Sequence, residues 1–292
     1  MLPRHGHRAA LPALVTVANG MISFVGAGPG AVDLMTLRGA DRLERADVVI
    51  WASSLVPAAI LGFSRGSAEL HDSASMTLED VLEVYSSRPG SRIVRLHSGD
   101  PSLYGAIAEQ IDWCVEHGRD FEIIPGVTSL SAAAAALGRE LTVPRIAQSV
   151  VVTRLPGRTR RSMPARESLA AFAAVGATTA VFLAGARPDE LQSELLAAGS
   201  AFSESTPAAV VVRASWPDEQ VHLTTVGELA RTIRASGETR TVLVVVGEAV
   251  APPPASKGRS HLYSPSFSHT FRTRSRPGST AGRPSRRAIP ER

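Results

Sequence analysis

Residues 22–30 read ISFVGAGPG, an apolar run followed by a glycine-rich turn, and together with the segments that come next they decide the fold. An amphipathic stretch at 36–46 predicts a helix, and a second apolar run at 47–51 predicts a buried strand. Strands that alternate with helices in this way are typical of a parallel sheet covered by helices. The alternation continues through predicted strands at 92–96 and 121–124 and predicted helices at 105–117 and 129–137. We therefore expect an α/β domain with a mainly parallel sheet over residues 21–141.

A second series of elements follows a connection that contains Pro and Arg. Its predicted strands cover residues 149–153, 179–183, 208–214, 220–224 and 241–246, and its predicted helices cover 168–175, 188–198 and 226–235. The link at 215–219 between two of these strands is short enough for a hairpin, so this sheet should be mixed. We expect a second α/β domain over residues 146–250.

The formal net charge of +4 is concentrated at the C-terminal end of the chain. Of the 31 basic and 27 acidic residues, nine and one lie in residues 251–292, so 22 basic and 26 acidic residues remain in the rest. The globular part therefore lacks the basic surface that follows nucleic-acid phosphates. The tail at 251–292, rich in Pro, Ser, Gly and Arg, predicts disorder. We expect the leader at 1–20 to be a disordered extension too, rather than the secretion signal that it faintly resembles.

Three classes of structure are disfavoured by composition. The single cysteine, Cys114, excludes an intramolecular disulfide and has no neighbouring ligands for zinc, so we expect a small packed residue on a helix and no metal site. No apolar run approaches the roughly 20 residues that a membrane-spanning helix needs.

Three loops follow predicted strands, at residues 26–30, 97–105 and 125–129. In open α/β sheets, ligands bind at the carboxyl ends of strands. The first loop departs from the dinucleotide-binding fingerprint, because Ala31 stands where the third glycine would be and Pro29 has no N–H to offer a phosphate. A structural turn and a ligand loop both fit this segment.

The polar residues of the other loops also have two possible roles. Asp100 can accept hydrogen bonds from ribose hydroxyls or neutralise a cationic ligand, but Asp before Pro also starts ordinary turns. Thr128 and Ser129 predict a helix cap, which is compatible with ligand contact. Thr77 and Asp80 are spaced as a capping box at another helix start. No Ser–His–Asp or Cys–His arrangement stands out, so the loops favour binding and orientation over nucleophilic catalysis.

Taken in order, four segments resemble the tetrapyrrole, or class III, methyltransferase family: VGAGPG (25–30), ADVVI (46–50), GDPSLYG (99–105) and PGVTS (125–129). The resemblance spans about residues 21 to 250. Within the family, three further segments resemble the branch that methylates precorrin-4 at C-11: ASSLV (52–56), HDSASMT (71–77) and RASWPDEQ (213–220). The branch that acts on uroporphyrinogen carries Asp-Arg-Leu-Val at the end of the second strand, with the Asp proposed as a base. Ala52 stands there in this chain, so no catalytic residue is carried over.

The resemblance implies a cytoplasmic homodimer that binds S-adenosylmethionine in a cleft between the two domains and takes a tetrapyrrole substrate from the trough above it. The implied cofactor-binding residues are Pro29, Ser98, Gly99, Asp100, Leu103, Tyr104, Thr128, Ser129, Leu183 and Ala214. Substrate carboxylates favour arginine partners. The candidates are Arg139, Arg154, Arg158, Arg160, Arg161 and Arg213, for each of which a solvated surface position is the alternative.

Two kinds of alternative stay open. The enzyme can act at another carbon of the corrin path or on uroporphyrinogen, and the substrate can carry cobalt or lack it. A different class is a nucleic-acid-binding or RNA-modifying protein that uses the basic tail.

Overall fold

The computed structural model describes residues 20–156, 162–252, 260–264, 267–270 and 272. The first sheet has the strand order β3-β2-β4-β1-β5, and every neighbouring pair is parallel. Its strands are β1 (Ile22–Gly26), β2 (Val48–Trp51), β3 (Glu69–Asp72), β4 (Ile93–His97) and β5 (Phe121–Ile124). The predicted parallel sheet is confirmed. The sequence did not predict β3, because Glu69-Leu70-His71-Asp72 has no apolar run and forms a largely exposed edge.

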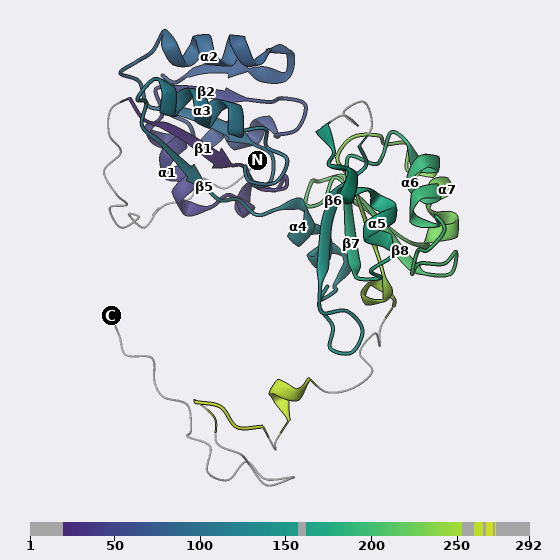
Figure 1. The fold of residues 1–292 in the computed structure, drawn as a ribbon. Helices are drawn as coiled ribbons and strands as arrows, with labels where there is room; N and C mark the ends of the chain where they lie inside the picture. Colours follow the sequence, from purple (N-terminus) through teal and green to yellow (C-terminus); the bar gives the residue numbers. More distant parts are fainter. Residues whose placement is uncertain (1–19, 157–161, 253–259, 265–266, 271, 273–292) are drawn as a thin grey trace.

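Helices cover both faces of this sheet (Figure 1). Helix α1 (Leu37–Arg45) packs on one face, and α2 (Leu78–Ser86) and α3 (Ala108–Glu116) pack on the other, where Cys114 is buried as expected. The predicted capping box is present, since the Thr77 side chain accepts from the Asp80 N–H and the Asp80 carboxylate accepts from the Thr77 N–H.

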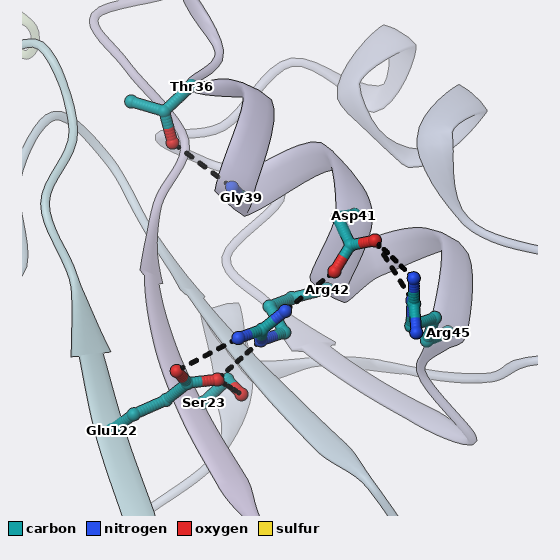
Figure 2. Close-up of polar contacts among 7 residues, drawn as sticks. All are labelled: Ser23, Thr36, Gly39, Asp41, Arg42, Arg45 and Glu122. Atoms are coloured by element: carbon teal, nitrogen blue, oxygen red, sulfur yellow. Dashed lines mark hydrogen bonds and ion pairs between the residues drawn. The ribbon is translucent and has the colours of Figure 1, made fainter. Parts of the chain in front are cut away.

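An ionic network holds α1 against the sheet (Figure 2). The buried Arg42 side chain donates to Asp41 at 2.6 Å and to Glu122 of β5 at 2.6 Å, and Ser23 of β1 donates to Glu122 at 2.7 Å. Arg45 donates to Asp41 at 2.9 Å. Burial alone would raise the pKa of Glu122, but the hydrogen bonds from Arg42 and Ser23 and the positive charge of Arg42 bring the pKa below its usual value. The network fixes the helix that follows loop 26–30.

The second sheet is mixed, as predicted, with the order β6-β7-β10-β8-β9. Its strands are β6 (Val150–Arg154), β7 (Thr178–Phe182), β8 (Pro207–Val212), β9 (Gln220–Thr225) and β10 (Val242–Val246). Only β6 and β7 are parallel, and β8 and β9 form the expected antiparallel hairpin. Three helices share one apolar core on one face, namely α5 (Leu169–Ala173), α6 (Pro188–Leu195) and α7 (Leu229–Ala235).

Helix α4 (Ser129–Leu137) covers the opposite face of the second sheet (Figure 1). Ala133 and Leu137 pack with Val211 of β8 and Val245 of β10, and Thr178 donates to the Leu141 carbonyl at 2.9 Å. From the sequence this helix is expected to belong to the first domain, because it directly follows the last strand of the parallel sheet. The sequence of an alanine-rich apolar helix does not indicate which of two neighbouring sheets the helix will cover.

The rest of the described chain consists of short 3-10 helices and the pieces of the tail. The 3-10 helices are Val32–Leu34, Ala58–Phe63, Ser73–Ser75, Ala165–Glu167, Val226–Glu228, Glu248–Val250 and His261–Tyr263. In the tail, His269 and Arg272 form an isolated bridge. The leader at 1–19 lies outside the described residues, as does most of the tail. Within the described parts of the chain, no helix combines the length and apolarity needed to span a bilayer.

Candidate ligand cavity between the two sheets

A cavity of about 380 Å³ lies between the loops at the carboxyl ends of the first sheet's strands and the strand ends of the second sheet. All ten residues that the family resemblance implied as cofactor contacts line it, eight from the first sheet's loops and two, Leu183 and Ala214, from the second sheet. Residues of the wall that the sequence did not single out include Leu55, Phe182, Trp216, Arg240 and Thr241. Of these, Leu55 and Trp216 had a signal in the sequence, since they lie in the segments at 52–56 and 213–220 that carried part of the resemblance.

The three strand-end loops of the first sheet press against one another under the cavity. Gly28 and Gly99 exchange two backbone hydrogen bonds, of 3.2 and 2.8 Å. A Cβ added to Gly126 would lie 2.1 Å from the Gly99 carbonyl oxygen, so only glycine fits there. The first loop is therefore both a structural turn and, through Pro29, part of the cavity wall.

Asp100 ties two of these loops together. Its Oδ1 accepts from the Ser102 N–H at 2.8 Å and from the Ser102 hydroxyl, and its Oδ2 accepts from the Gly126 N–H at 2.9 Å. Burial raises the pKa of Asp100, but these hydrogen bonds outweigh it and hold the pKa below the usual value. The carboxylate is therefore ionised at neutral pH, on the wall of the cavity.

Four residues of the wall have left-handed backbone conformations although none is glycine. The φ angles are 59° at Tyr104, 55° at Leu183, 50° at Arg213 and 55° at Thr241. The Arg213 N–H donates to the Thr241 carbonyl at 2.8 Å, which braces two of them. Such conformations cost free energy and are found where surrounding contacts impose them, often at functional sites.

The two sheets are latched together beside the cavity. The Trp216 indole Nε1 donates to the Pro29 carbonyl at 2.9 Å, and the Ser215 hydroxyl accepts from the Ala31 N–H at 3.0 Å. The Trp216 ring lies against Gly30 so closely that a Cβ on Gly30 would be 2.1 Å from the ring Cδ1. These contacts, called the Trp216 latch below, fix the loop that contains Ser215 and Trp216 onto the glycine-rich loop at 26–30.

The arginines that were candidates for substrate carboxylates are spread over several places. Arg213 lines the cavity, but its guanidinium already pairs with Asp218 and, at 3.0 Å, with Glu238. Arg154 donates to the Pro156 carbonyl at 3.2 Å and the Ser162 hydroxyl at 2.9 Å, outside the cavity wall.

Arg139 donates to the Gly138 carbonyl at 3.1 Å, at the end of α4 away from the cavity-lining Thr128 and Ser129. Arg158, Arg160 and Arg161 lie outside the described residues. None of the three candidates that the structure describes, Arg139, Arg154 and Arg213, has geometry that singles it out as a carboxylate site, so the assignment of all six stays a prediction. Among the residues that the structure describes, no group of three or more His, Cys, Asp or Glu side chains is placed to hold a metal ion.

Two α/β sheets that share a cavity built from strand-end loops are typical of a protein that binds a small molecule, and sequence comparison gives its family. Residues 21–230 match the family model of tetrapyrrole (corrin/porphyrin) methylases. The chain belongs to this family of methyltransferases.

Named relatives are similar over nearly their whole length. The cobalt-precorrin-4 C(11)-methyltransferase of Methanocaldococcus jannaschii is 43% identical over 87% of this chain and 96% of its own. The precorrin-4 C(11)-methyltransferase of Sinorhizobium sp is 41% identical over 87% of this chain and 98% of its own.

Two solved methyltransferase structures are similar to this chain over most of its length. The X-ray structure of a cobalt precorrin-4 methyltransferase matches with a TM-score of 0.75 and 40% identity, over 80% of this chain and 96% of that one. The uroporphyrin-III C-methyl transferase of Thermus thermophilus, complexed with S-adenosylhomocysteine, matches with a TM-score of 0.66 and 29% identity, over 79% of this chain and 99% of that one.

Proposed function

We propose that this protein transfers a methyl group from S-adenosylmethionine to C-11 of precorrin-4, with or without cobalt, and so makes precorrin-5 in cobalamin biosynthesis. The observation that carries the proposal is the cavity wall, where ten residues selected from motifs far apart in the sequence come together from both sheets. The named activities of relatives at 41% and 43% identity support the choice of substrate.

The cavity fits the proposed co-substrate in size and in charge. Its volume of about 380 Å³ lies in the usual range for small-molecule sites. The ionised Asp100 on its wall favours a cationic ligand, and a sulfonium is cationic. Gly99, with φ of 66°, lets a ligand approach the backbone closely.

When bound, S-adenosylmethionine supplies an already activated methyl group, so the protein's part is to orient and to exclude water. The glycine contacts and Asp100 hold the loops of the first sheet in one arrangement, and the Trp216 latch holds the second sheet's strand ends opposite them. Tyr104 and Phe182, whose ring centroids are 5.2 Å apart, close the wall with apolar surface from both sheets. Positioning of this kind can supply a large part of a rate enhancement without an acid or base.

We also propose that the enzyme works as a cytoplasmic homodimer, on the ground of its resemblance to the family. Size-exclusion chromatography with light scattering measures the mass in solution. A monomer at working concentration would remove the homodimer from the proposal and leave the activity untouched.

The first test of the cavity is calorimetric titration of the full chain with S-adenosylhomocysteine. We expect binding in the micromolar range, and a loss of at least about tenfold, or 1.4 kcal/mol, in Asp100→Asn, because the Gly126 N–H then loses a charged acceptor. Asp112→Asn, which changes an exposed carboxylate on α3, is the matched control and should bind like the parent. A folded parent protein that does not bind would contradict the proposal.

The second test identifies the product. Incubation with precorrin-4 and S-adenosylmethionine should add one methyl group by mass spectrometry, and carbon-13 NMR should place the new methyl at C-11. A methyl at another carbon, or turnover of uroporphyrinogen instead, would show that the substrate is wrong while the methyltransferase class stands.

A further inference from the structure

Three charged side chains line the cavity, and they differ in how they are paired. Asp100 is occupied by Ser102 and Gly126, and Arg213 is neutralised by two carboxylates. Arg240 is the exception, since its guanidinium makes no hydrogen bond or ion pair with any residue that the structure describes. Arg213 is among the arginines that the sequence singles out, and Arg240 is not.

The backbone that carries Arg240 is held firmly. The next residue, Thr241, is left-handed with φ of 55°, and its carbonyl accepts from the Arg213 N–H at 2.8 Å. The preceding residue, Thr239, packs against Gly185, where an added Cβ would lie 2.7 Å from the Thr239 carbonyl oxygen. Strand β10 then begins at Val242, in register with β8. Arg240 therefore lies in a turn that contacts on both sides hold in place, directly before β10 and next to the strand ends that form the cavity wall.

An unpaired guanidinium in this position has an electrostatic consequence if the cavity takes a sulfonium, as the proposed function requires. Two positive charges in one cavity repel each other, and an anion beside the guanidinium reduces the repulsion. Arg240 is exposed, so solvent also screens part of it. Arg213 creates no such problem, because Asp218 and Glu238 already balance it. Among the described residues of the wall, Arg240 is therefore the cation that has no carboxylate beside it, and a negative group of the ligand can take that place.

We infer that Arg240 binds a carboxylate of the bound ligand. This inference rests on the proposed function and names a contact within it. A guanidinium matches a carboxylate through two parallel N–H···O hydrogen bonds. Two sources offer that chemistry, the amino-acid part of S-adenosylmethionine and the acidic side chains of the tetrapyrrole, and each gives a different experimental result.

The test compares the parent with Arg240→Ala in two titrations. S-adenosylhomocysteine carries the carboxylate, and 5′-methylthioadenosine lacks it along with the amino group. If the carboxylate belongs to the co-substrate, Arg240→Ala weakens S-adenosylhomocysteine by about tenfold or more and leaves 5′-methylthioadenosine unchanged. If it belongs to the tetrapyrrole, both titrations stay as in the parent and the KM for precorrin-4 rises by about tenfold or more, with kcat changed less.

Two further variants make the result specific. Arg240→Lys keeps the charge but loses the bidentate geometry, so it should recover only part of the effect. Arg231→Ala removes an arginine of α7 that is 80% exposed and paired with Glu228, away from the cavity wall, and should behave like the parent. Unchanged titrations together with an unchanged KM in a folded Arg240→Ala would overturn the inference. Absence of S-adenosylhomocysteine binding by the parent would instead overturn the proposed function.

Discussion

At the scale of single residues, His97 is a titratable group that the fold forces to stay neutral. It ends β4, is 7% exposed, and its Nε2 has no hydrogen-bond partner among the described residues. Burial, and next the positive charge of Arg95, lowers the pKa of His97 to about 3. The folded protein therefore leaves the ring unprotonated in a range where the unfolded chain binds a proton, below about pH 6.5.

The expected consequence is a stability that falls on acidification. Because the folded pKa is depressed, the contribution of His97 is complete above pH 6.5 and is lost as the pH falls toward 3. Urea unfolding at pH 7.5 and 5.5 should give a difference of about 1.4 kcal/mol that is present in the parent and missing in His97→Gln. Comparison of the two proteins at both pH values cancels all other titrating groups. An equal loss in both would mean that His97 is protonated in the folded state.

At the scale of residues, the left-handed backbone conformations of non-glycine residues could not be predicted from the sequence. The glycines in the loops at 26–30, 97–105 and 125–129 indicated turns, because glycine readily adopts the backbone conformations that tight turns need. Leu183, Arg213 and Thr241 gave no such sign, since their left-handed φ angles are imposed by contacts between strand ends that lie far apart in the sequence. Arg240 could not be predicted as a residue of the wall for the same reason, because it directly precedes the left-handed Thr241.

At the scale of elements, the three loops of the first sheet behave as one unit, because Gly126 is in contact with Gly99 and Asp100 joins their strands' ends. Gly126→Ala should lower the free energy of unfolding by about 1–3 kcal/mol through overpacking, and should weaken S-adenosylhomocysteine as well. Urea unfolding and calorimetry measure the two effects. Gly90→Ala, where an added Cβ meets nothing within 4 Å, is the matched control. Parent-like stability and affinity in Gly126→Ala would show that the loops yield easily.

Most elements could be predicted because local patterns specify them. The strand at 121–124 and the helix at 129–137 begin and end at the predicted residues, and the capping box at Thr77 marks the start of α2. The edge strand β3 was missed, because an exposed strand needs no apolar alternation. The residues that line the cavity could be predicted only through the family resemblance, since each loop by itself also fits a structural turn.

At the scale of the whole molecule, the arrangement of the two sheets at the cavity depends on the loop around Trp216. Trp216→Phe keeps an aromatic ring against Gly30 but removes the indole N–H that reaches the Pro29 carbonyl. We expect S-adenosylhomocysteine affinity to fall by about fivefold, the equivalent of one hydrogen bond of about 1 kcal/mol. Trp113→Phe, which changes a tryptophan packed on Tyr85 within the first domain, is the control and should bind normally. Equal affinities in both variants would assign the latch no part in binding.

The position of α4 decides how the molecule can be taken apart. A polypeptide that stops after residue 141 would contain all five strands of the parallel sheet and also a helix whose partner surface, Val211 and Val245 among it, has been left behind. Such a fragment exposes an apolar stripe on α4, formed by Ala132, Ala133 and Leu137, and should self-associate in solution. When the fragment is mixed with the complementary fragment, the same stripe is the surface through which the two should reassociate, since its partner strands β8 and β10 are then supplied again.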